Sequence, residues 1–367
     1  MPRSTRLERE YRSFLARFGL PPPSREVAEQ VFAELRRGGR EGMDSLSPDV
    51  SPEKLIGMMQ ASGSGMQFVV DHISEEIEKS IGRAGLHLNA EFFAGEFPTG
   101  SFNAQACLVS NGTLLLLNTG LMVFLHKASK LVSHSIRFAP FGSDGKPILG
   151  TEERDDKPDT LSYAEQVDAF AELIVGYLFA ENDWVRRVRR IPFVTGAKAM
   201  LSAMVVNSAE KFVLAHEYGH AIAGHLSTSR TMVNRTPVGN VEFVAKRWED
   251  EFEADLIAAM LMITDLPRKI ERLEELFPLQ FATAGPLFFF ALDRLITKVA
   301  LDIKGLNEIC VITDHPPSDL RMQSVREVFQ RIGGSPATQL ADAYVDWVNH
   351  VGNDVLTSVR ERLRTQS

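Results

Sequence analysis

The sequence predicts an α+β fold that is mostly helical, and two patterns carry this prediction. Apolar residues recur at helical spacing over most of the chain, most clearly in residues 66–82, where they form one continuous face. Two short apolar runs, residues 103–109 and 113–118, flank the turn sequence Ser110-Asn111-Gly112. Because an Asn-Gly pair between apolar runs is the strongest short-range hairpin signal, we expect one small hairpin among the helices.

The predicted helices follow one another with polar connections between them. Ser24, directly after three prolines, is a suitable N-cap for an early helix. Residues 142–160 are rich in polar residues, Gly and Pro, which predicts a loop or lid, and residues 227–247 predict a basic connection. Helices are expected at residues 24–37, 66–82, 163–179, 197–226, 286–302 and 337–365, and from Trp248 and Ser318 onwards.

These segments suggest three regions of unequal size. We expect an N-terminal helical region at residues 1–84 and a main domain at residues 85–335 that carries an insertion at residues 122–195. Residues 336–367 are expected to form a C-terminal helix that packs on the main domain. The sequence gives no indication of the oligomeric state.

Composition excludes some classes of function. The net charge of −8 argues against nucleic-acid binding, which requires a basic surface. The two cysteines, Cys107 and Cys310, lie in apolar contexts, which predicts buried thiols rather than a disulfide. The N-terminal residues lack the apolar core of a signal peptide. Together these features predict a cytoplasmic protein.

Two long apolar stretches, residues 199–215 and 285–301, are expected to be buried helices rather than membrane spans. The second stretch contains Asp293, Arg294 and Lys298. Each such charge near the centre of a bilayer costs about 2.5–3.5 kcal/mol. We therefore expect no integral membrane segment.

The run AHEYGHAIAGH, Ala215 to His225, contains the motif His216-Glu217-x-x-His220. Residues four apart on an α-helix differ by about 40° around the axis, so both imidazoles leave one face and can bind one metal ion. Glu217 projects beside them, where it can act as a general base on water. These residues provide the chemistry of zinc-assisted hydrolysis. The alternative is a helix that carries two histidines on one face by chance.

A catalytic zinc usually has three protein ligands and one open position, so a third ligand is required. The metzincin pattern would place Gly at position 223 and His at position 226, where the sequence has Ala223 and Leu226. The metzincin arrangement is therefore excluded. His225 lies about 140° from His220 around a continuous helix, so we expect it behind the ligands rather than on the metal.

The motif EFEAD at residues 251–255 supplies another solution. Glu251 and Asp255 share a helix face, so Glu251 can bind zinc while Asp255 accepts a hydrogen bond from a ligand histidine and fixes its tautomer. Glu253 is the second candidate ligand, although it lies about 200° from Glu251 around the helix. The alternative is a solvated acidic helix start. The apolar residues in the same segment argue against that alternative, because they indicate that the region is buried. They are Ala254, Leu256, Ile257 and Met260.

Four motifs, taken in order, resemble those of the gluzincin metallopeptidases, in particular the CAAX prenyl proteases and the HtpX-like proteases. The first is the predicted hairpin, which begins at Asn103 and ends in NTGL at residues 118–121. The others are HEYGHAIAGH, EFEAD, and HPPSDLR from His315 to Arg321. The run FVLAHEYGHAIAGH also resembles the soluble Lit-type phage-exclusion peptidases, a rival subfamily with the same chemistry.

The resemblance implies a gluzincin-like metallopeptidase domain with one zinc ion per chain. His216, His220 and Glu251 would bind the zinc, and Glu217 would be the catalytic base. The resemblance further implies that residues 113–117 form an edge strand that aligns an extended peptide substrate.

The resemblance also brings His315 and Arg321 to the catalytic site. Either residue would stabilise the oxyanion, and His315 has the alternative role of a zinc ligand that keeps the enzyme latent. The long segment between Leu121 and His216, and the lack of the membrane helices of the prenyl proteases, depart from the family pattern. Both departures leave the substrate class open.

We therefore expect a zinc-dependent endopeptidase that acts on a peptide or protein substrate by Glu-assisted attack of water. The alternative is a catalytically silent or latent gluzincin scaffold that acts through protein–protein interaction. A third possibility is a helical interaction protein in which the HExxH motif is accidental.

Overall fold

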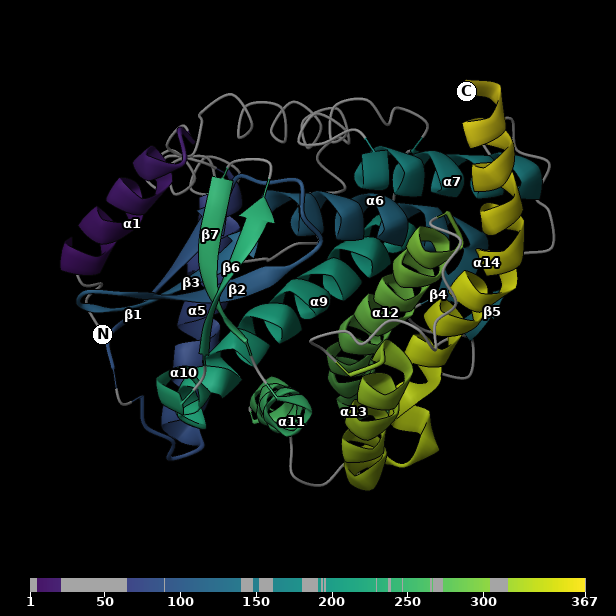
Figure 1. Cartoon of the computed structure of the whole chain (residues 1–367). Coiled ribbons are helices and arrows are strands. Elements are labelled where there is room, and N and C mark those ends of the chain that lie inside the picture. Colours follow the sequence, from purple (N-terminus) through teal and green to yellow (C-terminus); the bar gives the residue numbers. More distant parts are fainter. Residues whose placement is uncertain are drawn as a thin grey trace. The chain divides into compact units, whose positions relative to one another are not determined.

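The structure is a computed structural model and is mostly helical (Figure 1). The described residues are 5–20, 65–88, 90–139, 148–151, 161–179, 191–192, 194, 196–228, 230–236, 239–245, 247–264, 266, 273–303 and 316–366. Within these ranges there is one three-stranded sheet and there are two two-stranded sheets. The predicted α+β class with few strands is confirmed at this level. The predicted helix at residues 24–37 lies outside the described residues.

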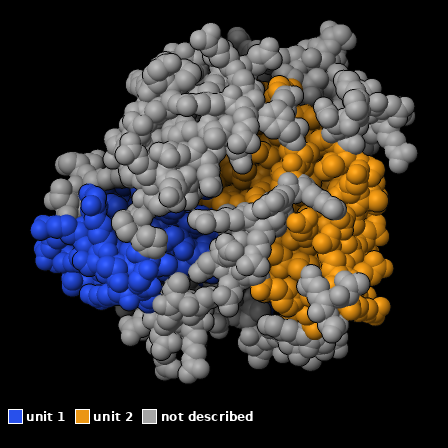
Figure 2. All heavy atoms as spheres, turned by 90° about the horizontal axis from the view of Figure 1, so that it is seen from above, with its two compact units in different colours: residues 1–121, 213–264 blue, residues 122–212, 265–367 orange. Residues whose placement is uncertain are grey.

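Two compact units divide the chain. The first unit comprises residues 1–121 and 213–264, and the second comprises residues 122–212 and 265–367 (Figure 2, blue and orange). The main domain expected at residues 85–335 therefore contributes to both units. The helix expected at residues 163–179, within the insertion at residues 122–195, belongs to the second unit.

The three-stranded sheet forms the centre of the first unit. Strand β3 (Gly112–Asn118) lies between β1 (Phe92–Phe97), which is parallel to it, and β2 (Ala104–Val109), which is antiparallel. Helices α1 (Thr5–Arg17) and α5 (Gly65–Arg83) pack on β1. The four leucines of β3 have no exposed surface, as expected of a central strand that is covered on both faces.

The predicted hairpin is confirmed, but the expectation that residues 113–117 form an edge strand is wrong. The segment FFAGEF, which was not predicted as a strand, pairs with β3 along its whole length, from Phe92 opposite Thr113 to Phe97 opposite Asn118. The amide of Thr113 donates to the carbonyl of Glu91 at 3.0 Å. Both sides of β3 are therefore hydrogen-bonded within the sheet, and no peptide can add to it.

The first unit is completed by elements around the HExxH motif. The long helix α9 (Gly196–Ile222) ends earlier than expected and is followed by the short helix α10 (His225–Thr228). The connection expected at residues 227–247 contains a hairpin that was not predicted, β6 (Arg230–Thr236) and β7 (Gly239–Ala245). The second strand of this hairpin could have been predicted from its alternating apolar residues, Val241, Phe243 and Ala245. Helix α11 (Trp248–Ile263) begins where it was predicted.

Helices dominate the second unit. The predicted helices are confirmed as α7 (Tyr163–Phe179), α12 (Leu273–Ile303), α13 (Ser318–Gly333) and α14 (Gln339–Gln366), with α12 longer at its start than expected. Most of α6 (Thr119–Ser135), the first part of α9 and a short 3-10 helix, η3 (Ser335–Thr338), also belong to this unit. Strands β4 (Ile136–Ala139) and β5 (Ile148–Thr151) pair there, so part of the expected loop at 142–160 is a strand, while 141–147 and 152–160 lie outside the described residues.

Aromatic contacts join the helices of the second unit. The rings of Phe288 and Tyr344 lie 5.0 Å apart between α12 and α14, and those of Phe170 and Trp347 lie 5.6 Å apart between α7 and α14. Within the described part of the chain, one helical segment, Leu276–Ile303, is long and apolar enough to cross a membrane, and 78% of its most apolar window is buried. The prediction that residues 285–301 form a largely buried helix is confirmed.

Candidate metal centre

The end of α9 and helix α11 bring the predicted metal-binding residues together within the first unit. Helix α9 carries His216, Glu217 and His220, all less than 9% exposed. Helix α11 buries Glu251 and Asp255 completely, on a face that continues through Ala254, Ala258, Ala259 and Met262. This face has helical spacing, so burial of the two carboxylates follows from the packing of the small residues around them.

The residues that predicted burial of this region are only partly buried themselves. Ala254 is fully buried, but Leu256 is 38% exposed and Met260 is 58% exposed. These two residues lie on the opposite side of α11 from Glu251 and Ala258. Burial of Glu251 was correctly expected, but the apolar residues Leu256 and Met260 were not evidence for it.

Gly219 allows α9 and α11 to approach closely. A Cβ atom at this position would lie 2.8 Å from the carbonyl oxygen of Ala254 and 3.0 Å from its Cα. Carbon atoms rarely approach the backbone of another helix so closely, because the optimum separation is about 3.5–4.0 Å. Gly219 lies one residue before His220, and Ala254 lies one residue before Asp255. Because glycine has no side chain at this contact, the acidic face of α11 can lie against the two histidines.

The side chains of His216, His220 and Glu251 converge on one point. The Nε2 atoms of the two histidines lie 3.0 Å apart. One carboxylate oxygen of Glu251 lies 3.4 Å from Nε2 of His216, and the other lies 3.3 Å from Nε2 of His220. The three residues form a buried group that can hold a metal ion.

These separations fit a tetrahedral metal site. Ligand atoms at about 2.0–2.1 Å from a tetrahedral ion lie roughly 3.3–3.4 Å from one another. The two nitrogens lie 3.0 Å apart, and each lies 3.3 or 3.4 Å from one of the two carboxylate oxygens, which is close to this value. Two imidazoles and one carboxylate are also a donor set that suits zinc and other transition metals better than calcium or magnesium, which prefer oxygen ligands.

Asp255 holds His216 from behind. Its Oδ1 atom lies 2.8 Å from Nδ1 of His216, while Nε2 of the same ring faces Glu251 and His220. Burial lowers the pKa of His216, but the charges and hydrogen bonds of Asp255 and Glu251 raise it, and the net shift is upward. The two carboxylates thus favour a positive charge at this point, which a metal ion supplies as well as a proton does.

His225 reaches His220 because α9 ends before it. Gly224 has a φ angle of +77°, a left-handed conformation that ends the helix and that glycine adopts without strain. The chain reverses there, so the angle of 140° expected for a continuous helix does not apply. Nδ1 of His225 lies 2.9 Å from Nδ1 of His220, and its Nε2 lies 3.2 Å from Oε2 of Glu253.

Burial favours Glu251 over Glu253 as the third candidate ligand. The side chain of Glu251 has no exposed surface and faces both histidines, whereas the side chain of Glu253 is 61% exposed and pairs with His225. Sequence reasoning missed this pairing. Gly224 could have indicated this pairing, because glycine is the residue type most favoured just after the end of a helix.

Only part of the motif HPPSDLR, from His315 to Arg321, lies within the described residues. His315 lies outside the described residues. Arg321 is buried in the second unit, where its guanidinium carbon lies 5.1 Å from the centre of the Phe290 ring and makes a cation–π contact. This contact gives Arg321 a packing role within its own unit, and the predicted catalytic roles of both residues stay predictions.

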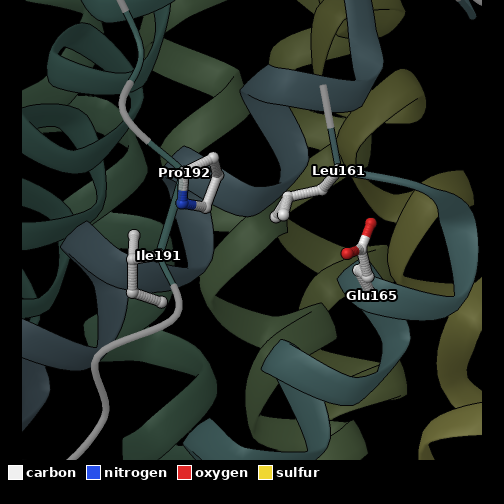
Figure 3. A pocket seen from close by; sticks show the side chains of 4 residues that line it. All are labelled: Leu161, Glu165, Ile191 and Pro192. Atoms are coloured by element: carbon white, nitrogen blue, oxygen red, sulfur yellow. The ribbon is translucent and has the colours of Figure 1, made fainter. Parts of the chain in front are cut away.

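A separate cavity of about 290 Å³ occurs in the second unit. Figure 3 shows its lining residues, Leu161, Glu165, Ile191 and Pro192. Glu165 accepts hydrogen bonds at 2.8 Å from the amide and hydroxyl of Ser162, which caps the start of α7. None of the candidate metal ligands lines this cavity, and the role of Glu165 there is to cap the helix.

Comparison with known proteins does not assign a family to this chain. No protein-family model matches the sequence, and no significant match was found among curated proteins or solved structures.

Proposed function

We propose that this chain is a zinc-dependent endopeptidase of the gluzincin type, similar to the CAAX prenyl proteases and the HtpX-like proteases, with the Lit-type peptidases as rival relatives. The observation that carries the proposal is the group formed by His216, His220 and Glu251, whose donor atoms face one another at 3.0–3.4 Å in a buried position. One zinc ion per chain would be bound by these three residues, with a fourth position open for water or substrate.

Zinc at this position would supply a Lewis acid that activates water at neutral pH and polarises a carbonyl group. Glu217 accepts a proton from the attacking water and then delivers it to the leaving amine. Its position directly after His216 on α9 and its burial, at 4% exposure, suit this task. Burial also keeps bulk water from competing for the carboxylate.

Asp255 prepares His216 for this role. Its hydrogen bond to Nδ1 fixes the proton on that nitrogen, so that Nε2 presents a lone pair to the metal. The bond also restrains rotation of the ring, which reduces the cost of organising the site when the metal binds. The substrate is a peptide or protein, since a zinc ligand set combined with a glutamate base is the chemistry of peptide-bond hydrolysis.

Metal content and peptide hydrolysis together test the proposal. The full chain, purified without chelator, is expected to contain about one zinc per molecule, and to cleave members of a mixed peptide library, as read by mass spectrometry. Glu217→Gln should retain the zinc and lose at least about 100-fold in cleavage rate. Glu249→Gln changes an exposed carboxylate of α11 and serves as the control that retains both properties.

Three results would contradict the proposal or part of it. Absence of zinc in the purified chain excludes a zinc-dependent peptidase. Zinc without cleavage of any peptide favours the silent scaffold. A demonstrated cleavage that survives Glu217→Gln shows that another residue is the base.

A further inference from the structure

Contacts between His220, His225 and Glu253 lead from the candidate metal ligands to the surface of the first unit. Its Nδ1 atom lies 2.9 Å from Nδ1 of His225, and both rings are buried. On the other side of the His225 ring, Nε2 lies 3.2 Å from Oε2 of Glu253 and 3.7 Å from Oδ1 of Asp250. These contacts thus run from α9 through α10 to α11.

The direction of the hydrogen bonds follows from metal binding. When Nε2 of His220 donates its lone pair to a metal, the proton of the neutral ring sits on Nδ1. That N–H must donate, so Nδ1 of His225 is the acceptor and Nε2 of His225 carries the second proton. This N–H then donates to the carboxylate of Glu253, which accepts it.

The opposite direction conflicts with metal binding. If Nδ1 of His225 donated to His220, the proton of a neutral His220 would lie on Nε2 and would point toward Glu251 and His216. A protonated Nε2 cannot bind a metal ion. The contact at 2.9 Å therefore selects the binding-competent tautomer only when Nδ1 of His225 accepts the hydrogen bond. The carboxylate of Glu253 favours that arrangement because it accepts a hydrogen bond from Nε2–H of His225.

His220 differs in this respect from His216. The outer nitrogen of His216 meets a carboxylate directly, Asp255, which is fully buried. The outer nitrogen of His220 meets another imidazole ring, and the carboxylate of Glu253 beyond that ring is 61% exposed. An imidazole orients the ligand without adding another buried negative charge beside Glu251 and Asp255, and such a charge is costly to bury.

We propose that His225 and Glu253 are positioning residues that hold His220 in the tautomer and orientation required for zinc binding. This inference rests on the proposed zinc site and assigns Glu253 a role outside the ligand set. It predicts that the acceptor atom of residue 225, rather than its size alone, sets the metal affinity.

Zinc affinity, measured by competition with a chelator, tests the inference without reference to peptide cleavage. His225→Asn places an amide oxygen near the position of Nδ1 and should bind zinc within a few-fold of the wild type. His225→Gln places the amide near the position of Nε2, and its zinc affinity should fall about 10–100-fold. Glu253→Gln should weaken binding less than His225→Gln, while Glu249→Gln, an exposed control on α11, should not weaken it.

Cobalt supplies a second measurement that a purely structural role would not change. The visible absorption of Co²⁺ bound in place of zinc reports the ligand geometry, so the spectrum of His225→Gln should differ from the wild type and that of His225→Asn should resemble it. Thermal unfolding of the metal-free variants controls for loss of packing.

Each outcome distinguishes the inference from the proposed function. Equal zinc affinity of wild type and His225→Gln, with Asp255→Asn weakened, would overturn the role of His225 and leave the metal site intact. Equal weakening by His225→Asn and His225→Gln would show that the ring packs rather than accepts, and would also overturn it. A wild-type chain that binds no zinc would overturn both.

Discussion

Replacing Gly219 with alanine tests whether the close approach of α9 and α11 holds Glu251 against the two histidines. The added Cβ would lie 2.8 Å from the carbonyl oxygen of Ala254 and 3.0 Å from its Cα. Because both are backbone atoms of a helix, no side-chain rotation relieves the contact. Helix α11 must therefore move away by at least about 0.5 Å to restore normal separations.

The size of the effect follows from two opposing terms. Alanine in place of glycine inside a helix stabilises it by about 1 kcal/mol, whereas overpacking of a tight contact costs about 1–3 kcal/mol. Gly82 in α5 is a matched control, because a Cβ there meets no atom within 4 Å. The difference in unfolding free energy between Gly219→Ala and Gly82→Ala removes the helix term and isolates the overpacking cost.

Urea unfolding of the metal-free variants measures this difference, and chelator competition measures zinc binding. We expect Gly82→Ala to be as stable as the wild type or more so, and Gly219→Ala to be about 1–3 kcal/mol less stable than Gly82→Ala. Zinc affinity of Gly219→Ala should fall about tenfold or more, comparable to the loss of a residue that orients a ligand. A Gly219→Ala variant that matches Gly82→Ala in both measurements would refute the reasoning.

Two further predictions concern the polar groups buried along α9. Tyr218→Phe removes a buried hydroxyl that lies 2.9 Å from Ser74 Oγ and 3.2 Å from Glu78 Oε1, so urea unfolding should show a loss of about 1–2 kcal/mol. Tyr163→Phe, at an exposed position, should change stability by less than about 0.5 kcal/mol, and equal losses would show that burial is not the cause. Burial raises the pKa of Glu210 to about 8, so the folded state keeps a proton that the unfolded chain loses near pH 4.5, and stability falls as the pH rises between these values. Glu210→Gln should therefore gain stability over the wild type as the pH is raised from 5 to 8, and a constant difference would contradict this.

The candidate site was predictable from the sequence to the extent that its signals are local. His216, Glu217 and His220 lie within five residues on one helix, and their spacing alone places them on a common face. Glu251 and Asp255 are also four residues apart, which separated them from Glu253. Helical periodicity is a short-range property, so helices α5 and α7 were predicted close to their observed bounds and α11 close to its observed start.

Other parts of the site depend on a single backbone angle. His225 lies behind His220, as expected, but the continuous helix expected through Leu226 is wrong, because the chain leaves the helix at Ile222 and turns at Gly224. Glycine is tolerated both inside helices and at their ends, so its identity alone does not specify which occurs. The pairing of His225 with His220 and Glu253 follows only from that turn.

The pairing of the strands was likewise predictable only between segments that are neighbours in the sequence. The hairpin of β2 and β3 was predictable because its turn joins neighbouring segments, but the parallel pairing of β1 with β3 was not, since no turn connects them. Local sequence was thus enough to identify a helix with candidate metal ligands, an acidic partner helix and a hairpin. Three-dimensional packing decided that β3 is central, that Gly219 admits Ala254, and that His225 supports His220. These contacts join residues whose approach is governed by burial and backbone direction rather than by their spacing along the chain.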